Sequence, residues 1–427
     1  MKTVKNNIVI RMIFLLVVMT CSGFLLKAAT FIIPVNPMKK NMQKCEEIFT
    51  SEGKYHVMNA GYLSTRLDNY TDAIMLLTSM YDDEQKNVFE KVAGSYRLAS
   101  EGKNPVECLV SFLDDEQLDS ETAYAHYWHG YVTILKPIFL FFDYSDVRIF
   151  NMIIQSFLVL YLLSLLNKDE YLKKYLLPLI VSLLAINPYT ISYSMQYSWI
   201  YYIVLGSSII LLKRREFFAE SPRELLIFFT IVGALTSFFD LLTWPLATCL
   251  IPLTFILIID KDNWIKEIVC VTKCGLSWCV GYLGMWCGCW ATGSLFLKRN
   301  VFQEALESIL FRTSNNISKD SIHIVTSKEV IRNQLFPLMK WPYAIMLFTV
   351  LFICIYKLIK QYRNGRVVSK RTLLGTIPFL LVSIIPFAWF LVSKNHSYLH
   401  YTFTYRILVI TLFSGLSMIV NLLNHES

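Results

Sequence analysis

The sequence predicts an all-α membrane protein with about ten transmembrane helices and with amphipathic helices in two long extracytoplasmic loops. The chain of 427 residues is 55% hydrophobic and 17% charged, whereas a soluble domain carries about 25% charged residues. Apolar runs long enough to cross a bilayer recur through most of the chain. Basic residues gather in the short segments between these runs, which is the distribution that fixes membrane orientation.

The first apolar run covers about residues 8–33 and follows Lys2 and Lys5. It is longer than a signal-peptide core of roughly 7–15 residues, so we expect a retained anchor. The polar stretch 34–129 contains Ile74, Leu77 and Met80 at helical spacing, which predicts an amphipathic helix. The apolar segment 130–142 is too short to span comfortably, and we expect it to lie at the interface. Further spans are predicted at 147–166, 175–190, 193–212, 225–239, 243–259, 268–295, 342–359, 373–392 and 407–423.

Charges between the spans predict that both chain termini are cytoplasmic in a plasma-membrane protein. The inner segments then carry Lys168, Lys173, Lys174, Lys213, Arg214, Arg215, Arg223, Lys261, Lys266, Lys357, Lys360, Arg363, Arg366, Lys370 and Arg371. The chain divides into an anchor (1–33), an outer loop (34–146), six helices (147–296), a second outer loop (297–340) and three final helices (341–427). Long loops cross the membrane largely regardless of their charge.

Composition and motifs argue against two other classes of protein. The net charge of +8 does not form a basic stretch interleaved with stacking aromatics, so no nucleic-acid partner is expected. The chain lacks a phosphate-binding loop motif and a dinucleotide fingerprint. Five of the ten cysteines lie with glycines in span 268–295, which we interpret as small residues on a closely packed helix face. Whether Cys45 and Cys108, in the first outer loop, form a disulfide is left open.

The first group of candidate site residues is acidic and lies in the first outer loop. Asp68 and Asp72 flank Thr71 at the start of the predicted amphipathic helix, with Thr71 as the expected N-cap. Carboxylates are stabilised at a helix N-terminus, so capping alone explains them. The functional alternative is a general base, or a ligand of a divalent metal ion, held at the membrane surface.

The other candidates are aromatic, cationic or acidic and are predicted on the same outer side. His126, Trp128 and His129 precede the interfacial segment, where an aromatic belt is the simpler explanation. The last outer loop is dense in polar and aromatic residues, and its two histidines are four residues apart. Its candidates are His396, Tyr398, His400 and Arg406, and single candidates elsewhere are Lys136, Arg148 and Asp240, of which Asp240 could simply cap the following helix.

This layout resembles the glycosyltransferase C superfamily of polytopic enzymes, in which one early span precedes a long outer loop with acidic residues. Asp68-Asn69-Tyr70-Thr71-Asp72 stands where many members carry an Asp-Glu pair. The resemblance implies a polyprenyl-phosphate-linked sugar as donor, a glycan or glycolipid of the cell envelope as acceptor, and Asp68 or Asp72 as the catalytic base. By the same analogy Arg406, His396, His400, Lys136 and Arg148 would bind the donor phosphate. The residues expected to bind substrate are His126, His129, Trp128, Tyr398 and Asp240.

Two other functions stay open from the sequence. A polysaccharide polymerase or ligase also uses lipid-linked sugars, but such enzymes usually carry their main outer loop late in the chain, and here the longest loop is early. A lipid or polysaccharide transporter or flippase would place ionisable residues near the bilayer midplane and show inverted repeats. The identity of the sugar and the acceptor, a metal requirement and the ranking of Asp68 against Asp72 are also left open.

Overall fold

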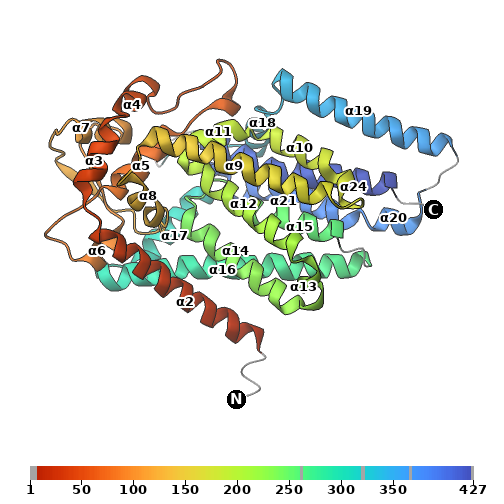
Figure 1. The fold of residues 1–427 in the computed structure, drawn as a ribbon, viewed down its shortest axis with the longest axis horizontal. Helices are drawn as coiled ribbons and strands as arrows, with labels where there is room; N and C mark the ends of the chain where they lie inside the picture. The colour runs from red at the N-terminus through yellow and green to blue at the C-terminus, as the bar shows by residue number, and fades with distance from the viewer. Residues whose placement is uncertain (1–6, 260–262, 319–322, 365–367, 425–427) are drawn as a thin grey trace.

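The structure is a computed structural model that describes residues 7–259, 263–318, 323–364 and 368–424 (Figure 1). The all-α prediction is confirmed, since the sheet in this part of the chain is one antiparallel pair of three-residue strands, β1 (Arg97–Ala99) and β2 (Ser120–Thr122). Eight helical segments in the described ranges are long and apolar enough to cross a membrane. They are α2 (Ile8–Ala29), α9 (Tyr144–Asn167), α12 (Met195–Lys213), α14 (Pro222–Phe239), α16 (Trp264–Leu297), α19 (Trp341–Arg363), α20 (Lys370–Leu374) with α21 (Ile377–Val392), and α23 (Tyr401–Thr404) with α24 (Leu408–Asn424).

Two of the ten predicted spans form shorter helices. The run 175–190 is divided into α10 (Leu176–Ala185) and α11 (Pro188–Tyr193). The division falls at Asn187, whose φ of 53° is left-handed, because the residue before a proline is disfavoured in a helix and asparagine tolerates this conformation. The span 243–259 begins only at Ala247, as the 13-residue helix α15 (Ala247–Ile259). A helix of that length reaches about 20 Å, less than the ~30 Å of a hydrocarbon core.

Small residues bring the long helix α16 close to its neighbours, as the sequence predicts. A Cβ on Gly281 would lie 2.0 Å from the Thr230 carbonyl oxygen of α14, and Gly233 of α14 meets α16 equally closely. Gly284 and Gly288 face side chains of α2 instead. Glycine is required at such contacts because any side chain would separate the two backbones. The α14–α16 pair lies along one side of the bundle (Figure 1).

The first loop forms a helical cap at one end of the bundle, on the left in Figure 1. Its helices are α3 (Val35–Gln43), α4 (Glu46–Glu52), α5 (Asn69–Ser79), α6 (Val88–Gly94), α7 (Pro105–Leu113) and α8 (Val132–Phe139), with the 3₁₀ turn η2 (Leu63–Thr65). Helices α3, α4, α5, α7 and α8 share a core that includes Met42, Phe49, Leu76 and Leu109. Helix α6 packs instead with α2 and α16. Cys45 and Cys108 are buried in this core as free thiols, so they do not form a disulfide.

The second loop and the last loop pack together. Helices α17 (Val301–Thr313) and α18 (Ser327–Leu335) both contact α22 (Lys394–Leu399), and α23 contacts η2 of the first loop. Segments from the beginning, the third quarter and the end of the chain therefore meet at one place.

Four basic residues used for the predicted sidedness, Lys2, Lys5, Lys261 and Arg366, lie outside the described residues.

Candidate functional site

Asp68 is the N-cap of α5, a role that the sequence assigned to Thr71. Its two carboxylate oxygens accept hydrogen bonds from the backbone N–H of Thr71 (3.1 Å) and from the Thr71 hydroxyl (3.0 Å). The expectation for Thr71 is wrong because the aspartate reaches the third residue beyond it, which is the standard capping distance. Burial raises the pKa of Asp68 to about 7, and the negative charge of Asp72 adds to the shift. This carboxyl group can therefore take up and release a proton near neutral pH.

Asp72 has different partners from Asp68 and joins α5 to the start of α12. It accepts hydrogen bonds from the backbone N–H groups of Met195 (2.9 Å) and Gln196 (3.0 Å) and from the Tyr144 hydroxyl (2.6 Å). The same tyrosine hydroxyl accepts from Arg148, which forms two bonds of 2.7 Å to Glu52. Asp72 is fully buried. Burial raises the pKa of its carboxyl group, and the hydrogen bonds from Tyr144, Gln196 and Met195 act in the opposite direction. The geometry is that of a structural carboxylate.

We expect Asp72→Ala to destabilise the fold by about 2–4 kcal/mol, because it leaves two backbone N–H groups and one hydroxyl buried without an acceptor. Thermal unfolding of the purified protein in lipid nanodiscs measures this loss. Asp68→Asn is the matched control, since asparagine is as good an N-cap as aspartate. An Asp72→Ala protein that is as stable as the wild type would contradict the structural role.

Arg406 and Tyr197 connect the end of the chain with the first loop. The Arg406 side chain is fully buried, and its guanidinium carbon lies 4.2 Å from the centre of the Tyr197 ring. Arg406 donates to the carbonyl oxygens of Thr402 (3.1 Å) and Ser64 (3.4 Å). The Tyr197 hydroxyl in turn donates to the carbonyl oxygen of Arg66, two residues before Asp68 (3.3 Å). Residues more than 300 positions apart thus share one polar region.

Arg312 of α17 lies against His400. Its Nη1 is 2.9 Å from His400 Nε2. Because an arginine only donates, this nitrogen accepts and the neutral ring carries its proton on Nδ1. Burial lowers the pKa of His400 to about 3, and the charges of Arg312 and Arg66 act in the same direction. His400 is therefore neutral at physiological pH, with one N–H available as a donor.

His396 lies beside His400, with 4.8 Å between the ring centres. Its Nε2 is 2.7 Å from the carbonyl oxygen of Leu242, so this nitrogen carries the proton. Burial lowers the pKa of His396 well below its ordinary value, and its Nδ1 is buried with no hydrogen-bond partner in the described part of the chain. Leu242 belongs to the turn that Asp240 closes by accepting from the Thr243 N–H (3.0 Å). Burial raises the pKa of Asp240 to about 6.

We call this polar region the central cluster. It consists of Arg66, Asp68, Tyr197, Arg312, His396, His400 and Arg406. Within the described ranges, no carboxylate oxygen lies within 4 Å of any of its three arginines. The Nε–H groups of Arg66 and Arg406 are buried without an acceptor there. Arg406 is fully buried and Arg66 and Arg312 are half-buried. Buried cations are normally paired, so this arrangement has the character of an anion-binding site.

The structure thus brings four of the sequence candidates into the central cluster: Asp68, His396, His400 and Arg406. Two more lie at its edge. Asp240 is linked to it through Leu242, and the charge of Arg312 helps burial to lower the pKa of His126 to about 4. Tyr398 instead packs against the apolar core near His323, with 6.1 Å between the rings.

Four further candidates hold the fold together elsewhere. Trp128 donates to the carbonyl oxygen of Met285 in α16 (2.6 Å), and His129 bridges the Tyr131 hydroxyl and the Tyr124 carbonyl. Arg148 is paired with Glu52, as described above. Lys136 is buried with its ammonium 4.6 Å from the centre of the Phe31 ring, and burial lowers its pKa to about 8. None of these geometries points into the central cluster.

Sequence reasoning did not find three members of the central cluster: Arg66, Tyr197 and Arg312. Arg66 is two residues from Asp68, so the segment itself was visible in the sequence. Arg312 lies on an exposed-looking amphipathic helix, and Tyr197 sits within an apolar span, so neither carries a distinctive local pattern. Their importance depends on the tertiary contact between α17, α12 and the last loop.

No group of three or more His, Cys, Asp or Glu side chains arranged to hold a metal ion occurs among the residues described. Comparisons with protein-family models, curated proteins and solved structures find no match to this chain.

Proposed function

We propose that this protein is a membrane glycosyltransferase that moves a sugar from a polyprenyl-phosphate donor to an acceptor of the cell envelope, on the outer side of the plasma membrane. The observation that carries the proposal is the composition of the central cluster. One buried carboxyl group with a pKa of about 7 belongs to the same cluster as three arginines that have no carboxylate partner in the described ranges. A base beside an anion site is what transfer from a sugar phosphate requires.

The chemistry follows from these groups. Ionised Asp68 accepts the proton of an acceptor hydroxyl as its oxygen forms a bond to the anomeric carbon of the donor sugar. The bond between that carbon and the phosphate oxygen breaks, and polyprenyl phosphate leaves with one additional negative charge. Arg66, Arg312 and Arg406 stabilise this charge, which develops mainly in the transition state. The neutral imidazole of His400 offers its Nδ1–H to the phosphate or to a sugar hydroxyl.

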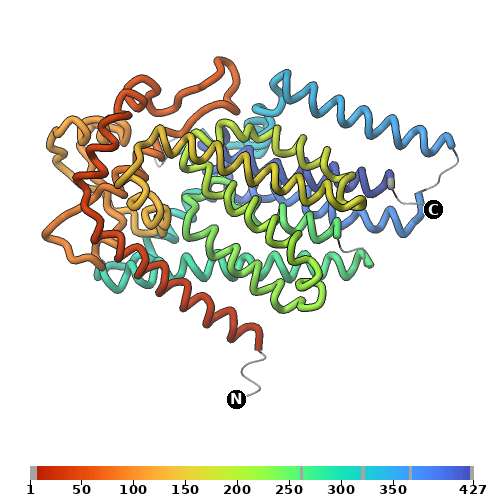
Figure 2. The backbone as a smooth tube through the Cα atoms, viewed as in Figure 1, coloured from red at the N-terminus to blue at the C-terminus, as the bar shows by residue number. Residues whose placement is uncertain are grey.

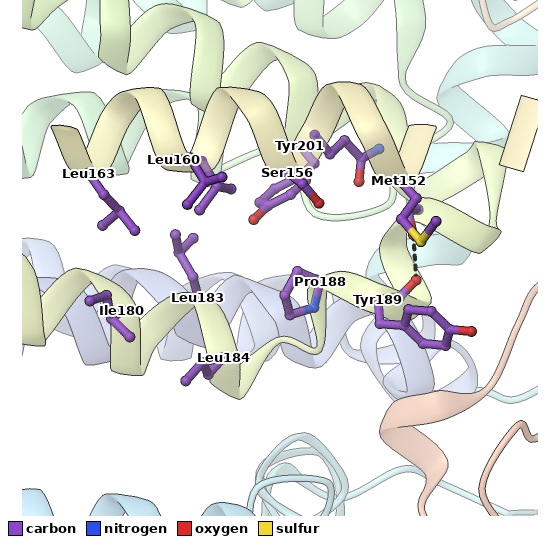
Figure 3. A pocket seen from close by; sticks show the side chains of 13 residues that line it. Met152, Ser156, Leu160, Leu163, Ile180, Leu183, Leu184, Pro188, Tyr189 and Tyr201 are labelled. Atoms are coloured by element: carbon purple, nitrogen blue, oxygen red, sulfur yellow. Dashed lines mark hydrogen bonds between the residues drawn. The ribbon is translucent and has the colours of Figure 1, made fainter. Parts of the chain in front are cut away.

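An apolar cavity supports a lipid-linked donor. It has a volume of about 560 Å³ and lies between α9 and the α10–α11 pair (Figure 3). Leucines and isoleucine line one end, including Leu160, Leu163 and Ile180, while Gln155 and Ser192 lie toward the other end. From there the chain leads directly into α12, which carries Tyr197 of the central cluster. We assign the polyprenyl tail to this cavity and the phosphate to the central cluster.

The test is a transfer assay with the purified protein in lipid nanodiscs. Polyprenyl-phosphate hexoses and pentoses with a labelled sugar are supplied with a panel of glycan and glycolipid acceptors. We expect product, and an equal amount of released polyprenyl phosphate, from a lipid-linked donor only. Transfer from nucleotide sugars, or lipid movement across the membrane without release of polyprenyl phosphate, would contradict the proposal.

A further inference from the structure

A second cavity lies at the opposite end of the bundle from α3–α8. Helix α19 stands apart from the other long helices along most of its length (Figures 1 and 2). It contacts α10 and α24, mainly through a small apolar cluster around Val181, Val350 and Cys354. From that cluster toward the C-terminal end of α19, a cleft of about 610 Å³ opens between the three helices.

The lining of this cleft combines apolar and basic side chains. Its apolar wall includes Leu177 of α10, Ile353 of α19 and Leu423 of α24. The basic lining residues are Lys357 and Lys360, both on exposed positions of α19, and Lys174, which lies in the 3₁₀ turn before α10 with its ammonium 4.0 Å from the centre of the Tyr171 ring. Gln361 donates to the Leu423 carbonyl oxygen (2.6 Å), which fixes this end of α19 to α24.

The length of the cleft fits one leaflet of a bilayer. The lining residues of α19 extend from Val350 to Asn364, which corresponds to about 20 Å of helix. The hydrocarbon core of a whole bilayer is ~30 Å thick, so one acyl chain with its headgroup matches this depth. A free phosphate ion would leave the apolar wall uncovered, whereas a phospholipid covers the wall and meets the lysines together.

We propose that this cleft is a binding site for an anionic phospholipid of the leaflet opposite to the central cluster. The phosphate and its negatively charged headgroup lie among Lys357, Lys360 and Lys174, and one acyl chain lies along Leu177 and Ile353. Basic pockets between membrane helices bind anionic headgroups in this way. The lipid fills the gap that side chains leave between α19 and the bundle, and so holds α19 in place.

The test compares lipid retention by native mass spectrometry after extraction from nanodiscs that contain equal amounts of phosphatidylglycerol and phosphatidylcholine. We expect the wild type to retain phosphatidylglycerol preferentially. The double variant Lys357→Gln/Lys360→Gln should lose this preference by about fivefold for each lysine removed. Its matched control is Lys168→Gln/Lys213→Gln, which removes two basic residues outside the cleft and should behave as the wild type.

A second variant distinguishes lipid binding in the cleft from attraction of lipid to a basic surface. Leu177→Trp keeps every lysine but fills the apolar wall, and Leu177 is 51% exposed, so the larger side chain is tolerated. We expect it to lose retained phosphatidylglycerol. Equal retention by all variants, displacement by inorganic phosphate alone, or a second copy of the chain bound at α19 in place of lipid would each overturn the proposal. The glycosyltransferase assay is independent of these outcomes.

Discussion

Asp68→Asn is expected to slow sugar transfer by about 10²- to 10⁴-fold, the contribution of a general base. Asparagine preserves the cap on α5, because its side-chain oxygen still accepts from the Thr71 N–H. What it removes is the group that takes the acceptor's proton. The measurement is the rate of transfer from the lipid-linked donor, together with binding of the donor, which should be nearly unchanged. A variant that transfers sugar at the wild-type rate would eliminate Asp68 as the base.

The pH dependence of the transfer rate and of the stability tests the role of the Asp68 carboxyl group independently. Because the base works only when it is ionised, the wild-type rate should rise with pH through about 7 and level off above it. The stability of the protein should move in the opposite direction. The folded pKa of Asp68 lies above the ordinary 3.8, so its contribution to stability is fully present below that value and is lost as pH rises through 7. Asp68→Asn, which does not ionise, should show neither effect.

The sequence predicted which segments meet but not which side chains meet. Apolar spans and basic loops together indicated that the loop around Asp68 and the loop around His396 share one side, and α23 does contact η2. Periodicity and charge are strong signals for helices in a membrane protein, which explains the success for the all-α architecture. The exact number of long helices was less accessible, since a break such as the one at Asn187 depends on a single Asn-Pro pair.

The candidate site shows more clearly what the sequence alone cannot predict. Asp68 and Asp72 are four residues apart on the same helix start, and nothing in their spacing says which one is engaged by another helix. The difference comes from the N-terminus of α12, which lies more than 120 residues away in the chain. Its backbone N–H groups donate hydrogen bonds to Asp72. Arg148 and Arg406 are likewise both buried arginines in apolar spans. The acidic partner Glu52, which comes from α4, makes the first structural. The second donates only to backbone carbonyl oxygens and has no carboxylate partner in the described ranges.

The difference between Arg148 and Arg406 predicts a large effect of substitution at Arg406. Arg406→Gln should lower kcat/KM for the lipid-linked donor by about 10²- to 10³-fold, comparable to the loss of one oxyanion donor. The same change should leave the melting temperature equal to or above that of the wild type, because it removes a buried charge that has no carboxylate partner in the described ranges. Transfer kinetics and thermal unfolding on one preparation measure both. Arg406→Lys should be intermediate, since it keeps the charge but loses the fork and the stacking on Tyr197.

Arg148→Gln is the matched comparison, and we expect it to lose stability but to keep transfer activity. It leaves the half-buried Glu52 without its cation and removes a bond to the Asn69 side chain, so we expect a loss of about 3–5 kcal/mol in stability. The folded fraction that remains should still transfer sugar, because Arg148 does not face the central cluster. If Arg406→Gln also unfolded the protein while its folded fraction kept full activity, Arg406 would only hold the start of the last span to Ser64. The anion site would then rest on Arg66 and Arg312 alone.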